Sequence, residues 1–420
     1  MPKVTALALI PLTFLAACGG GGGYSAGGGG TSTPTCTDSN ATLAQQVANP
    51  ATFFSADNNG VILELPAVGS AGATTVTGAV VFGIGTQSNN ALGSATVLPE
   101  DVTNGFITAT YKGAAYSKGY IDSGSNANFF NDSSLTTCPS PNQGFYCPSS
   151  TMTESVTLQG TSTTMVTPSF SVANADALFS NLNDTAFSNL GGTNPDAAAF
   201  NFGLPFFYGN NVYTAFENAS AGGYVGPYFA YSASSQSIPT PGPPNVETVT
   251  VDGGPSGSAI NTAYVSVKIC VPGTMTCQTI DHIEVDTGST GLRILYGALN
   301  SQLNGNALPQ ETNGTAGVVM TECLQFADGS SYGSLRLADI TLPVSGETAA
   351  NVVVQLIGDP NYAVPNGKVS GQSACPGAPE NTVMAFGANG ILGVGPFAQD
   401  CGNACVAAAS PIPGTYYSCH

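Results

Sequence analysis

Two short stretches of this chain join an apolar run to an acidic residue, a hydroxyl residue and a glycine, a pattern that could do chemistry. In each, a β-like run would deliver the carboxylate to the end of a strand, and the glycine permits a tight turn with an unusual φ. If the two loops face each other, both carboxylates cannot ionise and they share one proton. The residues are Asp122, Ser123, Gly124 and Ser125 in the first loop, and Asp286, Thr287, Gly288 and Ser289 in the second.

A proton shared between Asp122 and Asp286 would let one carboxyl group act as a base while the other acts as an acid. Water could then attack a peptide carbonyl with no metal, no other cofactor and no covalent intermediate. One such loop alone is weak evidence, because Asp and Gly are ordinary residues of turns. The repetition strengthens the functional interpretation. Systems that need histidine fit poorly, since the chain has only His282, interpreted as a structural strand residue, and the final residue His420.

The composition indicates a mainly β protein. Short runs rich in Val, Thr, Tyr and Phe are punctuated by Asn-Gly, Asp-Gly and Gly-Gly pairs, which favour turns. The formal charge of −18, with only seven Lys and Arg residues, argues against nucleic acid as a partner, because phosphate binding needs a basic surface. Only 8% of residues are charged, so the polar surface must come mostly from Ser, Thr, Asn and Gln.

The N-terminus predicts export and lipid attachment. Its apolar run is too short for a relaxed membrane span and suits a signal peptide. The run ends at Cys18 in a sequence that resembles the bacterial lipoprotein signal, so residues 1–18 are interpreted as signal peptide and lipobox, with an ordinary signal peptide as the alternative. The Gly-rich residues 19–35 predict a flexible tether. Gly19 resembles the signal for the outer membrane of a Gram-negative cell, and acyl chains on Cys18 would anchor the protein there.

Ten further cysteines remain, an even number that suits disulfides in an oxidising compartment. Short spacings favour three pairs, and elimination leaves two more, although sequence alone does not establish connectivity. Metal binding is the competing interpretation, and it is weak because histidines are few and no Cys-x-x-Cys pair is present. The expected pairs are Cys138 with Cys147, Cys270 with Cys277, Cys401 with Cys405, Cys323 with Cys375, and Cys36 with Cys419.

A Ser/Pro-rich segment, residues 232–245, is the best candidate for a linker between two blocks, residues 36–231 and 246–420. Each block carries one Asp loop. Each block also carries, downstream of that loop, two residues followed by a glycine: Asn201-Phe202-Gly203 in the first and Ile391-Leu392-Gly393 in the second.

These features together resemble the bilobal, pepsin-like aspartic proteases, in which a strand ending apolar-apolar-Gly crosses the Asp loop of each lobe. The fold implied is a mainly β, two-lobed architecture of barrels or sandwiches with a cleft between the lobes. The block that resembles the second lobe comes first in this chain, so the chain looks circularly permuted. The whole chain also resembles a set of uncharacterised bacterial lipoproteins.

The resemblance implies a role for each loop residue. Asp286 and Asp122 would be the acid-base pair that holds the water. Thr287 and Ser123 would brace the two loops against each other through their hydroxyls. The pair that would hydrogen-bond the outer carboxylate oxygens is Ser289 and Ser125.

A hairpin in the second block resembles the flap that closes over an extended peptide substrate in this family. Its turn contains Asp328 and Gly329, for which Asp-Gly between apolar runs is a good signal. Two positions depart from the family pattern. Phe326 stands where the flap usually has a Tyr, with Tyr332 on the other arm, and Arg293 stands where a Trp often follows the first loop.

The function expected from the resemblance is an aspartic endopeptidase that acts, as a monomer on the cell envelope, on extended peptides or proteins. One alternative is a catalytically silent protein of the same fold that binds peptide, since fold does not imply function. A second alternative is a purely structural envelope lipoprotein with a disulfide-linked β body.

Overall fold

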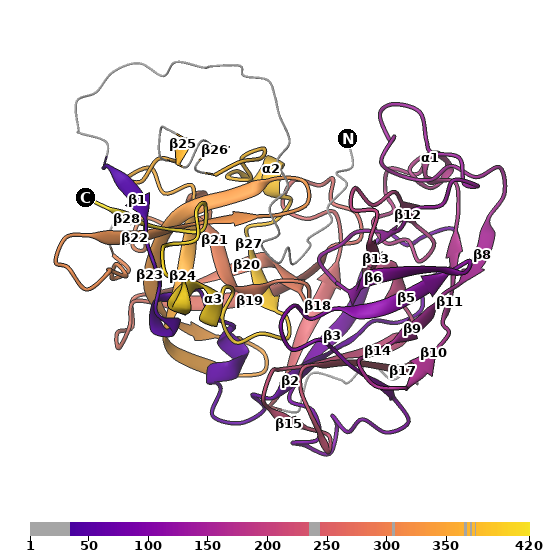
Figure 1. Cartoon of the computed structure of the whole chain (residues 1–420), viewed down its shortest axis with the longest axis horizontal. Coiled ribbons are helices and arrows are strands. Elements are labelled where there is room, and N and C mark those ends of the chain that lie inside the picture. Colours follow the sequence, from indigo (N-terminus) through magenta and orange to yellow (C-terminus); the bar gives the residue numbers. More distant parts are fainter. Residues whose placement is uncertain (1–33, 235–243, 305–306, 365–367, 370–371, 374) are drawn as a thin grey trace.

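A computed structural model of the protein describes residues 34–234, 244–304, 307–364, 368–369, 372–373 and 375–420 (Figure 1). Cys18, most of the predicted tether and the central part of the predicted linker lie outside the described residues. Among the residues described, no helix is long and apolar enough to cross a membrane. The described chain is mainly β, as the composition predicts.

The largest sheet has 15 strands and runs through both halves of the molecule. Its β19 also pairs with β23, which closes β23, β24, β21, β27, β20 and β19 into a six-stranded barrel. In spatial order the strands are β1 (Cys36–Asp38), β28 (Tyr416–Cys419), β22 (Val319–Gln325), β23 (Ser330–Thr341), β24 (Thr348–Ile357), β21 (Thr290–Leu295), β27 (Gly390–Val394), β20 (Cys277–Asp286), β19 (Ala263–Cys270), β18 (Val246–Val251), β3 (Val76–Phe82), β2 (Gly60–Glu64), β14 (Asn210–Ala215), β17 (Tyr228–Ala233) and β4 (Thr96–Pro99).

A second sheet of seven strands belongs to the first half of the chain. In order it contains β10 (Met165–Val166), β9 (Thr157–Gln159), β5 (Ile107–Tyr111), β6 (Ala114–Ile121), β13 (Ala199–Phe202), β7 (Asn128–Phe129) and β12 (Gly191–Gly192). Three two-stranded sheets are formed by β8 (Met152–Ser155) with β11 (Ser169–Val172), β15 (Ser220–Ala221) with β16 (Tyr224–Val225), and β25 (Lys368–Val369) with β26 (Gln372–Ser373).

The helices described are all short. They are α1 (Ala175–Leu178), α2 (Val383–Phe386) and α3 (Asn403–Ala407), with 3-10 turns η1 (Leu43–Gln45), η2 (Pro50–Phe53), η3 (Leu204–Phe206) and η4 (Tyr296–Ala298).

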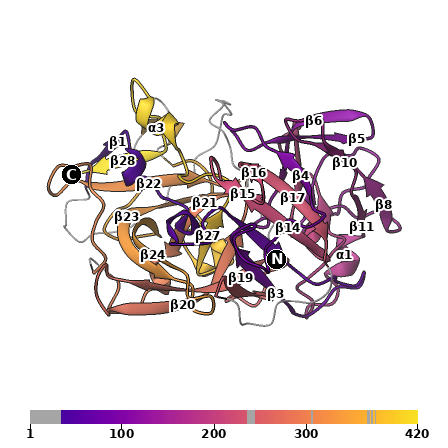
Figure 2. The same cartoon turned by 90° about the horizontal axis from the view of Figure 1, so that it is seen from below.

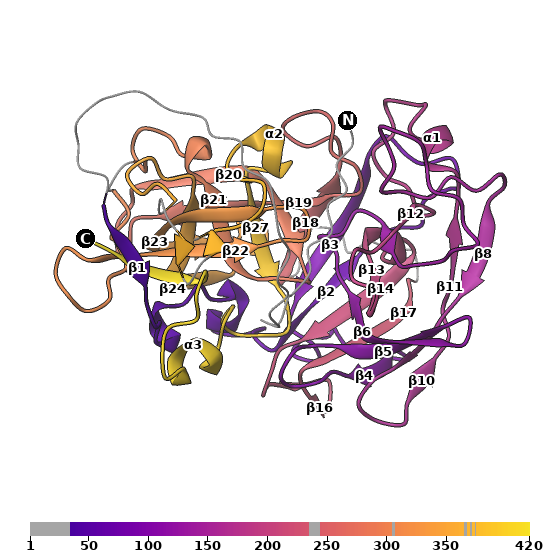
Figure 3. The same cartoon turned by 45° about the horizontal axis from the view of Figure 1, so that its top comes forward.

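The strands gather into two halves that lie side by side, with β3 and β18 between them (Figures 1 and 3). β3 and β18 pair antiparallel from Val76 with Val251 to Val81 with Val246, so this pair joins the two halves into one sheet. One large apolar core, with Phe200 and Val285 among its buried members, includes residues of both halves. The strands that carry the two Asp loops are therefore held on a common framework.

The N-terminal residues of the expected first block pack on the other half. β1 pairs with β28 along its whole length, as Figure 2 shows, and η2 packs against β24. The Asn49 amide donates to the Ala398 carbonyl at 2.9 Å. Residues 36–53 therefore pack on the C-terminal half, although they belong to the first block of the sequence. Sequence could not reveal this, because the partners are more than 300 residues away and β1 is only three residues long.

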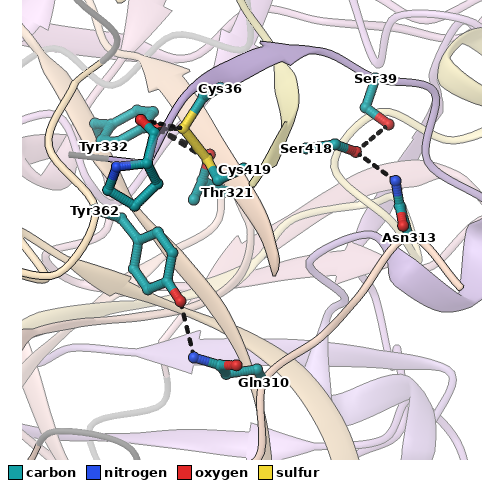
Figure 4. The surroundings of a disulfide bond; sticks show 10 residues. Cys36, Ser39, Gln310, Asn313, Thr321, Tyr332, Tyr362, Ser418 and Cys419 are labelled. Atoms are coloured by element: carbon teal, nitrogen blue, oxygen red, sulfur yellow. Dashed lines mark hydrogen bonds between the residues drawn. A yellow bond between two sulfur atoms is a disulfide. The ribbon is translucent and has the colours of Figure 1, made fainter. Parts of the chain in front are cut away.

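Five disulfides join the pairs that spacing and elimination favour: Cys36 with Cys419, Cys138 with Cys147, Cys270 with Cys277, Cys323 with Cys375, and Cys401 with Cys405. The first of these links the two ends of the described chain across the β1–β28 pair (Figure 4). Cross-linking so distant a pair constrains the unfolded chain strongly, which stabilises the folded state.

Candidate active site

The Asp122 and Asp286 side chains sit at the ends of two strands that are built alike. Asp122 follows β6, and β13 runs parallel beside it with Ile121 opposite Phe202. Asp286 ends β20, and β27 runs parallel beside it with Asp286 opposite Gly393. Neighbouring strands on both flanks bury these positions, so each carboxyl is fixed by the backbone of a sheet rather than by a free loop.

Each Asp loop closes on its own carboxylate. The Gly124 amide donates to Asp122 Oδ1 at 2.9 Å, and the Gly288 amide donates to Asp286 Oδ1 at 2.7 Å. These matching bonds hold one oxygen of each carboxyl in a defined place, and hydrogen bonds to a carboxylate favour its charged form.

Ser123 and Thr287 bind each other's loops reciprocally. The Thr287 amide donates to Ser123 Oγ, and the Ser123 amide donates to Thr287 Oγ1, both at 3.0 Å. Each hydroxyl then donates onward to the opposite strand, from Ser123 to the Val285 carbonyl at 2.7 Å and from Thr287 to the Ile121 carbonyl at 3.3 Å. The two loops are thereby locked together with every one of these buried polar groups satisfied.

The glycines of the two loops are needed for space. A Cβ atom on Gly124 would lie 2.6 Å from Asp286 Oδ1, and one on Gly288 would lie 2.4 Å from Asp122 Oδ1. Neither glycine has a positive φ, so the unusual φ expected from the sequence is corrected. Each glycine instead lets the carboxyl of the opposite loop approach its backbone.

The carboxyl groups of Asp122 and Asp286 are fully buried and hydrogen-bond each other. Burial raises the pKa of Asp122 well above its usual value, and the charge of Asp286 and the hydrogen bond between the two groups raise it further. Burial also raises the pKa of Asp286, but the hydrogen bond from Asp122 opposes this. The two carboxyls therefore titrate as a coupled pair, which favours one proton shared between them.

The outer oxygens of the two carboxyls, Oδ2 of Asp122 and Oδ2 of Asp286, differ in the hydrogen bonds that they accept. Asp122 Oδ2 accepts hydrogen bonds from Ser125 Oγ at 2.6 Å and from Asn201 Nδ2 at 3.3 Å. On the other side, the Ser289 hydroxyl lies close enough to lower the pKa of Asp286. Neither Ser289 Oγ nor Asp286 Oδ2 completes a hydrogen bond of normal geometry with any residue that the structure describes.

Asn201 is a site residue that the sequence analysis did not assign. It lies opposite Tyr120 on the strand pair, and its amide also donates to Ser125 Oγ at 2.6 Å, which orients that hydroxyl toward Asp122. Ile391 holds the corresponding position beside Asp286 and has no donor to offer. The sequence does distinguish this position, because Asn201 is polar where the apolar-apolar-Gly pattern expects an apolar residue.

The hairpin expected as a flap is formed by β22 and β23, and its turn closes with the Phe326 amide donating to the Gly329 carbonyl at 2.8 Å. Phe326 is buried in an apolar cluster with Tyr264 and Ile391, which lie beside the Asp286 strand. Asp328 is close enough to influence the charge of Glu284, which lies two residues before Asp286. The turn therefore lies near the second Asp loop.

Tyr332 lies on β23, the second arm of the hairpin. Its hydroxyl lies 2.8 Å from Thr321 Oγ1 and next to the Cys36–Cys419 disulfide (Figure 4). Tyr332 stands opposite Cys323, and both belong to a buried cluster with Cys375, Tyr417 and Cys419. These contacts place its side chain beside the disulfide that joins the two ends of the described chain.

Arg293, at the place where the related pattern often has a Trp, is fully buried in an ionic network. Its guanidinium donates to Glu322 Oε1 at 2.7 Å and to Asp400 Oδ2 at 2.9 Å. Tyr416 hydrogen-bonds the other oxygen of Asp400 and accepts from the Val47 amide at 3.1 Å. The network ties the strand after the Asp286 loop to the N-terminal segment.

No metal centre emerges from the described residues near the two carboxyls. Among all the described residues, one group of three side chains could hold a metal ion, and it consists of Cys138, Cys147 and Asp176. Its two sulfur atoms are joined in a disulfide. A cavity of about 490 Å³ near α1 has none of the Asp-loop residues in its lining. The paired carboxyls are thus the best-defined chemical site in the described part of the chain.

Comparison with known families gives one match. A family model described as a protein of unknown function (DUF3443) matches residues 28–231 and 241–420. Both Asp loops lie inside the matched ranges, and the unmatched gap falls within the Pro-rich residues 232–245. No curated protein matches the chain.

Proposed function

This chain belongs to the DUF3443 family, whose function is unknown, and we propose that it is an aspartic endopeptidase. The single observation that carries the proposal is the fully buried pair of carboxyls, Asp122 and Asp286, which lie close together inside two reciprocally braced loops. A purely structural turn would not need two carboxyls in contact, because burying them together is costly.

The reaction follows from where the proton is held. The ionised Asp286 takes a proton from a water molecule, whose oxygen attacks the peptide carbonyl carbon. Asp122 gives its proton to the carbonyl oxygen, which forms a tetrahedral diol. As the C–N bond breaks, Asp286 passes its proton to the leaving nitrogen, and a hydroxyl proton of the diol returns to Asp122. The pair then holds one proton again.

The two outer oxygens suit these roles. Asp286 Oδ2 has no protein donor of normal geometry in the described residues, so it is free to accept from a water molecule. Asp122 Oδ2 is held by Ser125 and Asn201, which fixes the direction in which this carboxyl presents its proton.

The proposal includes a pepsin-like, two-lobed fold with the lobes in swapped order. Parallel strand pairs beside both Asp loops, β13 with β6 and β27 with β20, support it. The disulfide between Cys36 and Cys419 also supports it, because it closes the chain where an unpermuted protein would run straight through. Cys18 would anchor the enzyme in the outer membrane, where extended peptides or proteins are its substrates.

Cleavage of a denatured protein at acidic pH tests this proposal. The protein begins at Gly19 so that it is soluble, and it is compared with Asp286→Asn and Asp122→Asn. Cleavage by the wild type should fall by at least about 10³-fold in both variants, because each loses the acid or the base. Glu154→Gln, which removes a surface carboxylate that pairs with Lys112, should cleave normally. Cleavage that survives either Asn substitution would reject the paired-carboxyl mechanism.

A peptide-binding protein without catalysis is the second candidate. It is favoured by the complete burial of both Asp carboxyls and by Phe326, which lacks the hydroxyl that a Tyr would bring to the site. Equilibrium binding of the same peptides, measured by calorimetry, distinguishes the two functions. Binding by the wild type without any cleavage, across pH 3 to 8, would establish this second function in place of the first.

A further inference from the structure

Glu284 lies beside the two carboxyls and takes no part in the reaction proposed above. It is two residues before Asp286 on β20, so both side chains leave the same face of the strand. Glu284 stands between Tyr264 on β19 and Ile391 on β27. These two residues belong to the apolar cluster that also holds Phe326 of the hairpin, and Glu284 is only 3% exposed. Its carboxyl lies close enough to Asp286, Asp122 and Asp328 for their charges to raise its pKa.

The Glu284 carboxyl has no partner of opposite charge. Among the residues that the structure describes, none forms an ion pair or a hydrogen bond with it. Four of the basic side chains are committed elsewhere, in ion pairs of Lys112, Lys118, Arg293 and Arg336. An acidic group buried without a partner is costly, and proteins retain such groups where a ligand supplies the partner.

In the described part of the chain, the charged groups that influence the pKa of Glu284 are all acidic. Burial raises its pKa well above the usual value, and the carboxyls of Asp286, Asp122, Asp328 and Glu380 raise it further. Glu380 approaches the hairpin turn closely, since a Cβ on Gly329 would lie 2.5 Å from Glu380 Cγ. A cation placed beside the Glu284 carboxyl would favour its charged form and would be attracted by it.

The matching position of the first loop carries a different residue. Tyr120 is two residues before Asp122, and its ring packs 5.8 Å from the ring of Phe106. Because the two loops brace each other reciprocally, Tyr120 and Glu284 occupy equivalent places on opposite sides of the Asp pair. One side of the site is thus aromatic and the other is acidic.

We infer that Glu284 is a specificity-determining residue that binds a Lys or Arg side chain of the substrate, next to the bond that is cut. The residue on the other side of that bond would be apolar and would pack near Tyr120. This inference rests on the proposed endopeptidase function and adds a substrate class to it. The overall charge of −18 agrees with a preference for cationic peptides.

Cleavage-site profiling with a library of random peptides tests the inference. The wild type should favour Lys and Arg at one position beside the cut bond. Glu284→Gln should lower kcat/KM for those peptides by on the order of a hundredfold, mainly through KM, and leave peptides with apolar residues there nearly unchanged. Glu284→Asp should restore part of the preference, and Glu154→Gln, the matched control, should keep it whole.

Two results would overturn the inference. One is cleavage by the wild type with no preference for basic residues, which would leave the endopeptidase function intact. The other is an equal loss for basic and apolar peptides in Glu284→Gln, which would indicate a structural role. If no peptide is cut at all, equilibrium binding of Lys and Leu versions of one peptide decides. A Lys preference that disappears in Glu284→Gln would support the inference while the endopeptidase function fails, and no preference would reject both.

Discussion

The two Asp loops are alike in backbone and unlike in the side chains around them. Both close on their own carboxylate through a glycine amide, and both brace the other loop through a hydroxyl. Around Asp122 the neighbouring strand supplies Asn201, a donor, whereas around Asp286 it supplies Ile391, which donates nothing.

This difference explains how two similar carboxyls can take different roles. Backbone symmetry brings the groups together, and the unequal side chains decide how each is oriented and hydrogen-bonded. In the proposed mechanism, Asp122, with both oxygens held, presents a proton in a fixed direction, and Asp286 keeps one oxygen for the incoming water. The division of roles therefore comes from the positions opposite Tyr120 and Glu284 rather than from the Asp-(Ser/Thr)-Gly-Ser motif itself.

The largest effect is expected where the two loops approach most closely. Gly124→Ala and Gly288→Ala each place a Cβ within 2.6 Å of the opposite carboxyl. The clash should destabilise the fold by about 1–3 kcal/mol and lower cleavage by on the order of a hundredfold, because small displacements of reacting groups are costly. Peptide cleavage assays and urea unfolding measure the two effects.

Gly69→Ala is the matched control for both glycine variants. No atom lies within 4 Å of its added Cβ, and its φ is not positive. It should leave cleavage and stability unchanged. Full cleavage by either loop variant would contradict the close approach of the two carboxyls.

The next effect compares the two hydroxyl residues that brace the loops, Ser123 and Thr287. Ser123→Ala removes the acceptor of the Thr287 amide and a 2.7 Å bond to the Val285 carbonyl, and Thr287→Val removes the equivalent acceptor but a longer bond of 3.3 Å. Ser123→Ala should therefore cost more, about 1–2 kcal/mol of unfolding free energy. Urea unfolding is compared with Ser258→Ala, an exposed serine. If Thr287→Val lost as much unfolding free energy as Ser123→Ala, or more, the lengths of these hydrogen bonds would not determine their contributions to stability.

A smaller effect concerns the support of Asp122. Asn201→Leu removes a donor that stabilises the charged form of Asp122, so its pKa should rise and the pair should keep its proton to higher pH. The basic limb of the pH profile of cleavage should move up by roughly half a unit. Ser125→Ala, which removes the shorter bond to the same oxygen, should move the limb further in the same direction. A shift to lower pH in either variant would contradict the assignment of the proton to Asp122.

The smallest effect compares carboxyls outside the loops, one in each half. Burial raises the pKa of Glu64 to about 7 and the pKa of Glu347 to about 7. A carboxyl whose pKa is raised in the folded state stabilises the fold fully below its unfolded pKa, near 4.5, and this contribution is lost as pH rises through 7. Unfolding free energy measured in urea should therefore fall between pH 4.5 and 7.5. Glu64→Gln and Glu347→Gln should each reduce the fall, and an unchanged fall in both would contradict this origin.

Much of this arrangement can be predicted from sequence because it is local. The Asp loops, their glycines, the two residue-residue-Gly segments and the hairpin around Asp328 are each contained in a few consecutive residues. The short cysteine spacings are local as well. The packing of residues 36–53 on the C-terminal half is not local, and no pattern of three residues specifies a partner strand at the far end of a chain.

The polar residues around the site show the same limit. In the sequence, Asn201 interrupts an apolar motif, but in the structure it donates a hydrogen bond to Asp122. Glu284 reads as an ordinary strand residue, but it is buried without a partner among the described residues. Tyr332 lies on the predicted hairpin, and its hydroxyl contacts Thr321. In each case the role depends on which strand lies alongside, and that pairing is decided by the whole fold.

The central claim is that Asp122 and Asp286 divide one proton. Carboxyl-carbon NMR of protein labelled with ¹³C-aspartate measures this directly, with Asp122→Asn and Asp286→Asn used to assign the two signals. We predict coupled titration of the pair, with one proton retained well above the usual pKa of Asp and held on Asp122. Two independent titrations, both complete below about pH 4, would contradict the account.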